Sequence, residues 1–94
     1  MTRFRIADAA LIKGRGIVLF GDVISGTPSD GMRFESPFSK DEVIVVQGIE
    51  IAIGMDDAGT RFTRFGLLIK DFKETDFQRW RDFALTKPEI HLIK

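Results

Sequence analysis

The side chains that could do chemistry are few and scattered in this chain of 94 residues. It contains no cysteine and one histidine, which excludes thiolate nucleophiles, disulfides and cysteine-based zinc sites. His91 has one carboxylate nearby in sequence, Glu89, two positions earlier on the same face of an expected strand. No nucleophile or set of metal ligands stands beside this pair, and the Asp56-Asp57 turn is too short for a calcium loop. The sequence therefore predicts no catalytic residue, no metal site and no cofactor.

The Gly14-Arg15-Gly16 segment allows two interpretations. Its backbone N–H groups and the Arg15 guanidinium are suited to binding a phosphate. Its glycines also supply the positive φ values of a tight hairpin turn. The segment lies between two expected strands rather than at the start of a helix, where phosphate loops are found, so we favour the turn. Arg15 remains a candidate ligand-binding side chain.

A second basic segment, residues 61–65, alternates cations with aromatic rings. In an extended strand Arg61, Thr63 and Phe65 face one way, whereas Phe62 and Arg64 face the other. An exposed Phe62 beside Arg64 would suit base stacking and a phosphate contact. The alternative is that the aromatic side chains are in the core and the arginines are ordinary solvated charges. Arg61, Phe62 and Arg64 are candidate contacts on the first interpretation.

The charges are unevenly distributed along a chain whose formal net charge is zero. Residues 1–33 carry five basic and three acidic groups, residues 34–60 one and six, and residues 61–94 eight and five. A neutral total argues against a general, salt-driven nucleic-acid binder. If the two basic ends meet in the fold, they would form a local basic face, for which we name Arg3, Arg5, Arg61 and Arg64. The opposing acidic face would contain Glu35, Asp41 and Glu42.

No apolar run is long enough to span a membrane and no secretory signal is evident, so we expect a cytoplasmic protein without a membrane partner.

The apolar residues recur mainly with the two-residue period of strands, which predicts six short strands. They contain Phe4 and Ile6 with the run 9–12, residues 17–24, Met32 with Phe34, residues 43–53, Phe62 with residues 65–69, and Ile90 with Leu92. Gly21 lies inside the second strand and predicts a sharp bend or bulge, which barrels require. Residues 55–59 are expected to form a turn.

One helix is expected near residues 75–85. Thr75 and Gln78 have the spacing of a capping box, and Pro88 ends the helical region. An apolar stripe follows at three- and four-residue spacings, formed by Phe77, Trp80, Phe83 and Ala84. The stripe predicts that Trp80 clamps the helix onto the sheet, whereas a helix standing apart would expose Phe77 and Trp80 as a partner-binding patch.

The fold class is therefore mainly all-β: one domain over residues 1–94, a six-stranded closed antiparallel barrel with a short helix before the last strand. Closure into a barrel would remove edges that such apolar strands otherwise expose.

Five elements of the sequence resemble, in order, the second, β-barrel domain of translational GTPases such as elongation factor Tu. They are residues 4–8, the segment 12–18 containing Gly-Arg-Gly, residues 21–27, Gln47-Gly48-Ile49-Glu50, and Ala58-Gly59 followed by residues 66–70. The resemblance extends over roughly residues 4–72. The helix before the last strand departs from that family. No Gly-x4-Gly-Lys-Ser/Thr phosphate loop is present, so the barrel would occur without the GTPase domain.

The resemblance implies a barrel fold and a site for the aminoacylated end of tRNA, which falls here on Glu50, Leu67 and Leu68. The alternative is that Glu50 simply points to solvent between two isoleucines.

Two functions follow as hypotheses. The first is a non-catalytic binding module that docks on RNA or a ribonucleoprotein such as the ribosome. The second is a protein-interaction or self-assembling barrel that uses exposed Phe and Trp side chains. An enzyme is the least supported class. Salt separates the first two, because phosphate contacts weaken steeply with salt and apolar contacts do not.

Overall fold

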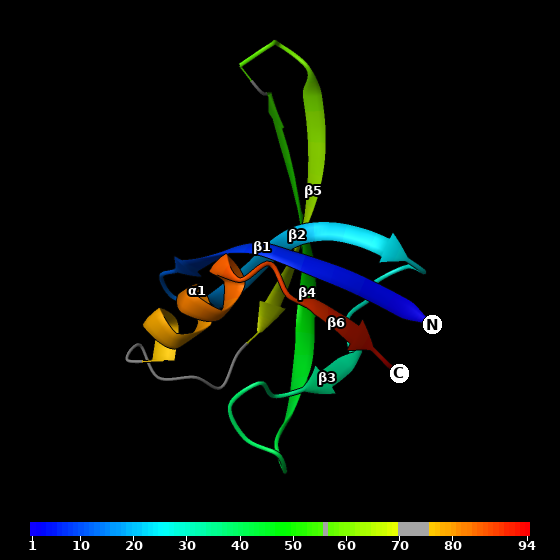
Figure 1. The fold of residues 1–94 in the computed structure, drawn as a ribbon, viewed down its shortest axis with the longest axis vertical. Helices are drawn as coiled ribbons and strands as arrows, with labels where there is room; N and C mark the ends of the chain where they lie inside the picture. The colour runs from blue at the N-terminus through cyan, green and yellow to red at the C-terminus, as the bar shows by residue number, and fades with distance from the viewer. Residues whose placement is uncertain (56, 70–75) are drawn as a thin grey trace.

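In the part of the chain that the structure describes, six antiparallel strands and one helix make up the fold (Figure 1). The computed structural model describes residues 1–55, 57–69 and 76–94, and of Phe62 only the backbone. The sheet order is β3-β4-β5-β2-β1-β6. The predicted mainly-β fold with a helix before the last strand is confirmed. In chain order the elements are β1 (Thr2–Ile12), β2 (Gly16–Ser25), β3 (Arg33–Glu35), β4 (Val43–Met55), β5 (Arg61–Ile69), α1 (Phe77–Leu85) and β6 (Glu89–Leu92).

The two outermost strands of this order meet and bring the sheet to near closure. The Arg33 N–H donates to the Ile93 carbonyl at 2.8 Å, and the Ile93 N–H donates back to the Arg33 carbonyl at 3.0 Å. This bridge joins the start of β3 to the end of β6. The first and last strands, β1 and β6, are antiparallel neighbours from Thr2↔Leu92 to Arg5↔Glu89. The two ends of the chain therefore meet in the fold.

The alternating apolar residues of the strands fill the barrel. Phe4 and Ile6 of β1 face inward, while Arg5 faces solvent. The same alternation places Leu19 of β2 and Leu67 of β5 in the interior, both with no exposed surface. The largest fully buried side chains are Phe4, Ile6, Ile17, Val18, Leu19, Val46, Leu67, Ile69 and Leu92.

Helix α1 packs against the barrel through its apolar stripe. Trp80 is 3% exposed and Ala84 is fully buried. The Trp80 ring makes edge contacts with Phe34 of β3 at 6.2 Å and with Phe38 at 4.9 Å between centroids. The prediction that Trp80 clamps the helix is confirmed, and a partner-binding patch centred on Trp80 is wrong.

Of the predicted capping box, Thr75 with Gln78, the structure describes only Gln78. The N-cap is Asp76, which makes no side-chain cap hydrogen bond, and Thr75 lies outside the described residues. The Gln78 amide donates to Asp82 at 2.8 Å instead, one turn further along the helix. The i,i+4 partner competes for the amide that a capping box would use.

Gly21 sits at the predicted bulge. Pairing between β1 and β2 runs Ile6↔Gly21 and then Asp8↔Phe20, so Ala7 is an extra residue in β1. A Cβ on Gly21 would lie 1.9 Å from the Arg5 carbonyl oxygen, far inside contact distance. Only glycine lets the two backbones approach this closely where the barrel wall bends.

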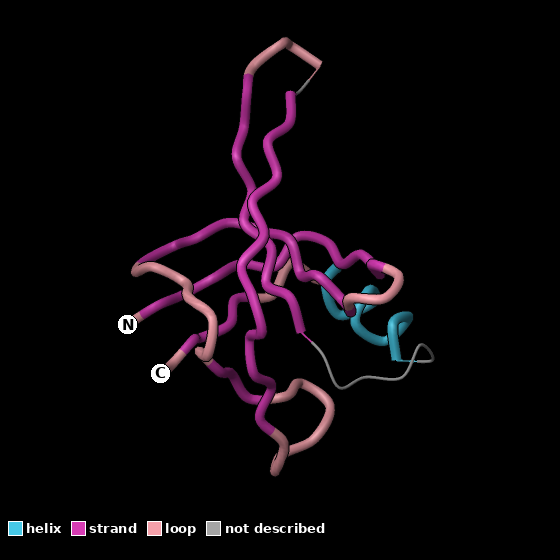
Figure 2. The backbone as a smooth tube through the Cα atoms, turned by 180° about the vertical axis from the view of Figure 1, so that it is seen from behind, coloured by secondary structure: helices cyan, strands magenta, loops and turns pink. Residues whose placement is uncertain are grey.

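The hairpin of β4 and β5 extends well beyond the barrel (Figures 1 and 2). β2 accompanies β5 only from Ile69 to Phe65, whereas β4 and β5 stay paired outward as far as Met55↔Arg61. We call the projecting part, residues 51–55 and 61–65, the arm. β4 continues two residues further than the sequence indicated, and Asp57–Gly59 lie in the turn, where Gly59 has φ +82°.

Candidate functional site

The Arg15 hairpin turn and Glu50 form one ion pair on the outside of the barrel. The Arg15 N–H donates to the Ile12 carbonyl at 3.0 Å, and Gly14 and Gly16 have φ values of +80° and +139°. The turn interpretation is therefore confirmed. The Arg15 guanidinium binds the Glu50 carboxylate, a contact between residues that sequence reasoning treated separately. The two side chains are 54% and 32% exposed, so the pair stabilises the fold by at most about 1 kcal/mol.

The leucines assigned to a ligand pocket are in the wall of the barrel. Leu67 is fully buried in the core and Leu68 is 6% exposed. Glu50 lies opposite Gly66 of β5, next to the Leu67 register position. The three residues are thus neighbours in the sheet, but the leucines offer a ligand almost no surface. The carboxylate that would accompany them is already bound to Arg15.

The arm carries the predicted basic segment. Arg61 lies opposite Met55 and Arg64 lies opposite Ala52, so the two arginines emerge from opposite faces of the hairpin. Both are exposed. Phe62 is in the strand, but its side chain falls outside the described residues, so the proposed base stacking stays a prediction.

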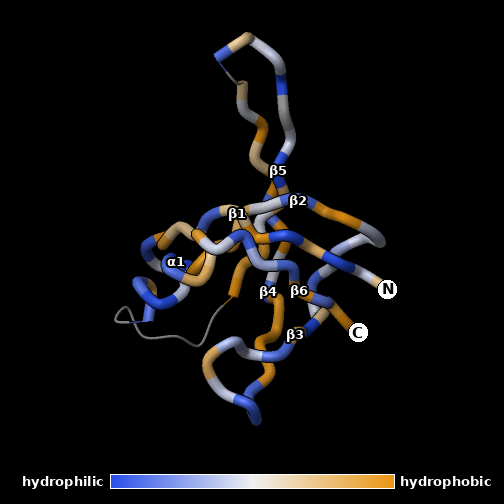
Figure 3. Tube along the Cα trace, in the orientation of Figure 1, coloured by the Kyte–Doolittle hydropathy of each residue, from blue (hydrophilic) through white to orange (hydrophobic). Residues whose placement is uncertain are grey.

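An exposed aliphatic row runs along one face of the arm and was missed by sequence reasoning. Ile51, Ile53 and Met55 are 63%, 73% and 62% exposed, although isoleucines in alternating strands are usually core residues. Figure 3 shows hydrophobic residues reaching far out along this hairpin. We call these three residues the aliphatic row.

The aliphatic row continues the core-facing side of the barrel wall. Ile49 and Phe65, at the base of the arm, still pack against the core, and Ile51 pairs with Phe65 across the hairpin. Further out, no described element covers this face. The side chains on this face of β4 therefore pack against the core at one end of the strand and are exposed to solvent at the other.

The arm is not a basic element. Together with the turn that joins its strands, residues 51–65, it contains Asp56 and Asp57 against Arg61 and Arg64, a net charge of zero. Binding to nucleic acid driven mainly by phosphate contacts needs a surplus of positive charge. The arginines can supplement a contact made by the arm but cannot supply its main attraction.

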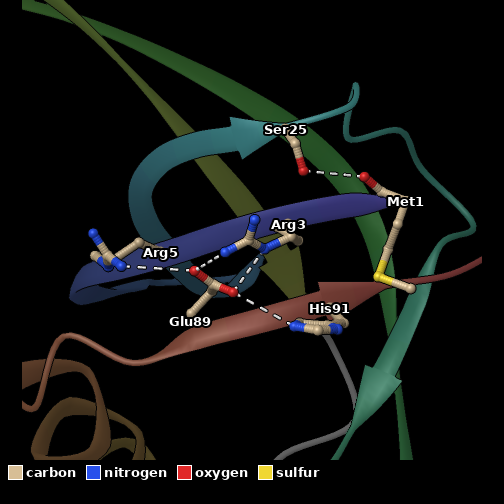
Figure 4. A network of polar contacts seen from close by, with 6 residues as sticks. All are labelled: Met1, Arg3, Arg5, Ser25, Glu89 and His91. Carbon is tan, nitrogen blue, oxygen red and sulfur yellow. Dashed lines mark hydrogen bonds and ion pairs between the residues drawn. The ribbon is translucent and has the colours of Figure 1, made fainter.

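A polar cluster around Glu89 lies on the outer face of β1 and β6 (Figure 4). Arg3 forms hydrogen bonds to both carboxylate oxygens of Glu89, donating from Nε and Nη2 at 2.8 Å each. Arg5 Nη2 and His91 Nε2 stand 3.6 Å and 3.5 Å from that carboxylate. The expected sharing of a strand face by Glu89 and His91 is confirmed.

Electrostatics keep Glu89 ionised. The hydrogen bonds from Arg3 lower the pKa of Glu89 below its ordinary value of 4.5, against a smaller opposing effect of burial, and the charges of Arg3, Arg5 and His91 lower it further. The same partnership raises the pKa of Arg3. A carboxylate held this way is a poor proton acceptor at neutral pH, because its bound cation favours the charged form.

A shallow hollow of about 390 Å³ adjoins this cluster where β3 and β6 diverge. Its lining residues are Phe34, Glu35, Glu89, Ile90, His91 and Ile93. Glu35 and Glu89 give it acidic walls, so Glu35 of the predicted acidic face lines the same hollow as the carboxylate that binds Arg3. Because Arg61 and Arg64 also emerge from opposite faces of the arm, the single basic face predicted from the sequence is wrong.

No protein-family model, curated protein or solved structure matches this chain. The resemblance to the second domain of translational GTPases therefore stays a prediction. Among the described residues, no group of three or more acidic or histidine side chains is arranged to hold a metal ion. The described helix is too short to cross a membrane.

Proposed function

We propose that this protein is a non-catalytic binding module that docks on a ribonucleoprotein, with the arm as its main contact element. The observation that carries the proposal is the aliphatic row, three large apolar side chains more than 60% exposed on an element that projects from the barrel. Exposed apolar surface of this kind marks interaction sites in soluble proteins. The resemblance to a translation-factor barrel supplies the class of partner.

The composition of the arm favours contact with the protein part of such a partner. Isoleucine and methionine gain from burial against apolar surface, at roughly 25 cal/mol for each Å² removed from water. Arg61 and Arg64, one on each face, are placed to add contacts to phosphates or acidic side chains at the rim. The net charge of zero over residues 51–65 supports this division of roles.

The polar cluster supports a binding role over a catalytic one. Its one carboxylate is gripped by Arg3 through both oxygens, and the histidine beside it is 57% exposed. General acid–base catalysis requires a group that can change its protonation state near neutral pH next to a bound substrate. Glu89 is held in its charged form instead.

Docking through RNA contacts alone is the second candidate, favoured by the exposure of Arg61 and Arg64. It differs from the first in its salt dependence, since each phosphate contact that is formed releases counterions. An RNA-led interaction should therefore weaken steeply as salt is raised, whereas contact by the aliphatic row should persist.

Co-sedimentation with purified ribosomes at low and moderate salt tests the proposal. The double variant Ile51→Ser/Ile53→Ser should bind at least about tenfold more weakly at both salt concentrations, since burial of each side chain contributes roughly 1.5–3 kcal/mol. The matched control is Val43→Ser, which removes an aliphatic side chain of 53% exposure at the other end of β4. It should bind like the wild type.

Arg61→Ala/Arg64→Ala separates the two candidates. If the aliphatic row makes the main contact, this variant keeps most of its affinity for the ribosome. Binding by the wild type is then only mildly weakened by salt. Loss of binding in the arginine variant alone, with a flattened salt slope, would favour the RNA candidate. Absence of ribosome binding by the wild type even at low salt would reject the ribonucleoprotein as partner.

A further inference from the structure

The outer edge of β4 is an open sheet edge. β3 pairs with β4 only along residues 43–45, and the last hydrogen bonds on that side join Val46 to Gly31 and Met32. From Gln47 to Met55, no described strand lies on the side of β4 away from β5. The backbone N–H and C=O groups along this edge that point away from β5 are therefore available to another strand.

Beyond the bulge at Gln47, this edge lacks the devices that usually keep strand edges from pairing. Lysine, proline and outward charges are the common protections. Residues 47–55 contain no lysine or proline, and their one charge, Glu50, is bound to Arg15. The open stretch of β5 on the other side of the arm, residues 61–64, carries two arginines. The two edges of the arm are thus unequal, and β4 has the one suited to pairing.

We propose that β4 of a second copy of this chain pairs with this edge, antiparallel and about a two-fold axis. Antiparallel self-pairing puts facing residues on the same side of the sheet. The aliphatic rows of the two copies would then merge into one continuous apolar face. The symmetry makes each contact occur twice, as in closed homodimers.

The register of this pairing follows from the bulge and the charge. β4 skips Gln47 in its pairing with β5, which is regular from Gly48 to Met55, and an axis on Ala52 pairs residues 49–55 of the two copies. Centring the axis on Ala52 places Ile51 opposite Ile53 of the second copy. It also places Glu50 opposite Gly54, where no side chain opposes the Arg15 ion pair. An axis through Glu50 would bring two carboxylates together, which like-charge repulsion disfavours.

The predicted dimer is reversible. Seven paired residues on each side fall well below the roughly 20–30 of a standard protein interface, so we expect association in the micromolar range rather than a permanent assembly. This inference goes beyond the proposed function, because it concerns the edge of β4 rather than its aliphatic face. It can be tested with the purified protein alone, so its outcome is independent of ribosome binding.

Sedimentation velocity of the purified chain over a wide concentration range tests the dimer. Ala52→Glu should weaken it at least about tenfold, since two carboxylates would meet at the axis and like charges facing each other oppose pairing. Within one chain the new carboxylate lies opposite Arg64, a favourable cross-strand partner, so the hairpin itself is not threatened. Ala52→Gln, with the same shape and no charge, should stay within about threefold of the wild type.

Disulfide trapping fixes the geometry. Because the chain has no cysteine, Ala52→Cys introduces a unique thiol that should give a covalent dimer on mild oxidation. Thr63→Cys, on the face of the aliphatic row opposite Ile53, should not. Preferential trapping through position 63 would mean that the arms stack face to face and would overturn edge pairing. A wild type that stays monomeric at all concentrations, or an Ala52→Glu variant that dimerises normally, would overturn it equally.

Discussion

Replacing Trp80 with alanine should remove a large part of the stability of the fold. The side chain is 3% exposed and an aromatic residue of this size buries roughly 150–250 Å², which corresponds to about 4–6 kcal/mol of transfer free energy before relaxation. Core Trp-to-Ala changes cost about 3–5 kcal/mol. A domain of this length has a free energy of unfolding of about 5–14 kcal/mol. The variant should therefore retain a fraction of the native stability and unfold at much lower denaturant.

Urea titration followed by far-ultraviolet circular dichroism is the suitable assay, because Trp80 is the only tryptophan and its removal abolishes the intrinsic fluorescence signal. With a slope of about 1.5 kcal/mol per M, the midpoint should fall by about 2–3 M. Leu85→Ala is the matched control in the same helix, since Leu85 is 60% exposed and should cost no more than about 0.5 kcal/mol. A loss of less than about 1 kcal/mol for Trp80→Ala, with an unchanged slope, would refute the role of Trp80 as the anchor of α1.

Two further predictions concern the barrel wall. Because the folded state holds Glu89 at a pKa below its ordinary value of 4.5, the unfolded chain takes up this proton first on acidification; the stabilisation is complete above about pH 5 and is lost as the pH falls through the folded-state pKa. Glu89→Gln should therefore have a flatter dependence of unfolding free energy on pH between about 5 and 3 than the wild type, and equal slopes would contradict the pairing with Arg3. Gly21→Ala should cost about 3 kcal/mol or more, because its Cβ would overlap backbone, while Gly48→Ala, whose Cβ would meet Leu68 at an ordinary 3.7 Å, should cost less than about 1 kcal/mol. Similar denaturation midpoints for the two glycine variants would show that β1 and β2 can move apart at Gly21 at little cost.

Local patterns in the sequence were sufficient to predict the strands, the helix and its anchor. The spacing of Phe77, Trp80 and Phe83 places all three on one face only if the segment is a helix. The periodicity therefore predicted both the helix and the burial of Trp80 in it. Gly21 inside an apolar strand indicated a bend because no other residue tolerates the close approach of two backbones. The partner of Gln78 was not predicted, because its amide bonds to Asp82 one turn further along the helix, and sequence spacing does not decide between these partners.

The binding surface could not be predicted because alternation tells which way a side chain points and not what lies opposite it. Ile51 and Ile53 follow the same pattern as the core residues Leu67 and Ile69. They differ only because β2 ends its pairing with β5 at Phe65, so the sheet beyond is two strands wide. The sequence does not show how far the hairpin of β4 and β5 extends beyond the end of β2.

The ion pairs could not be predicted from the sequence for a related reason. Arg15 and Glu50 stand 35 positions apart, and Arg3 and Glu89 stand 86 apart. Each pair depends on the register between strands that are distant in sequence, which the hydrophobic pattern specifies only to a face and not to a residue. The resemblance to translation factors named Glu50 as a site residue but gave no indication of its partner.

The pairing of β1 with β6 also bears on how the chain folds. Thr2 cannot meet its partner Leu92 until nearly the whole sequence has been made, and contacts between such distant positions form slowly because the intervening chain must first lose its freedom. Until then β1 has one free edge and the barrel interior is open beside it. During synthesis the hairpin of β4 and β5, whose partners are close in sequence, is complete well before the barrel can close. The apolar arm is thus presented early, which makes the half-made chain prone to aggregation at the same surface that we assign to docking.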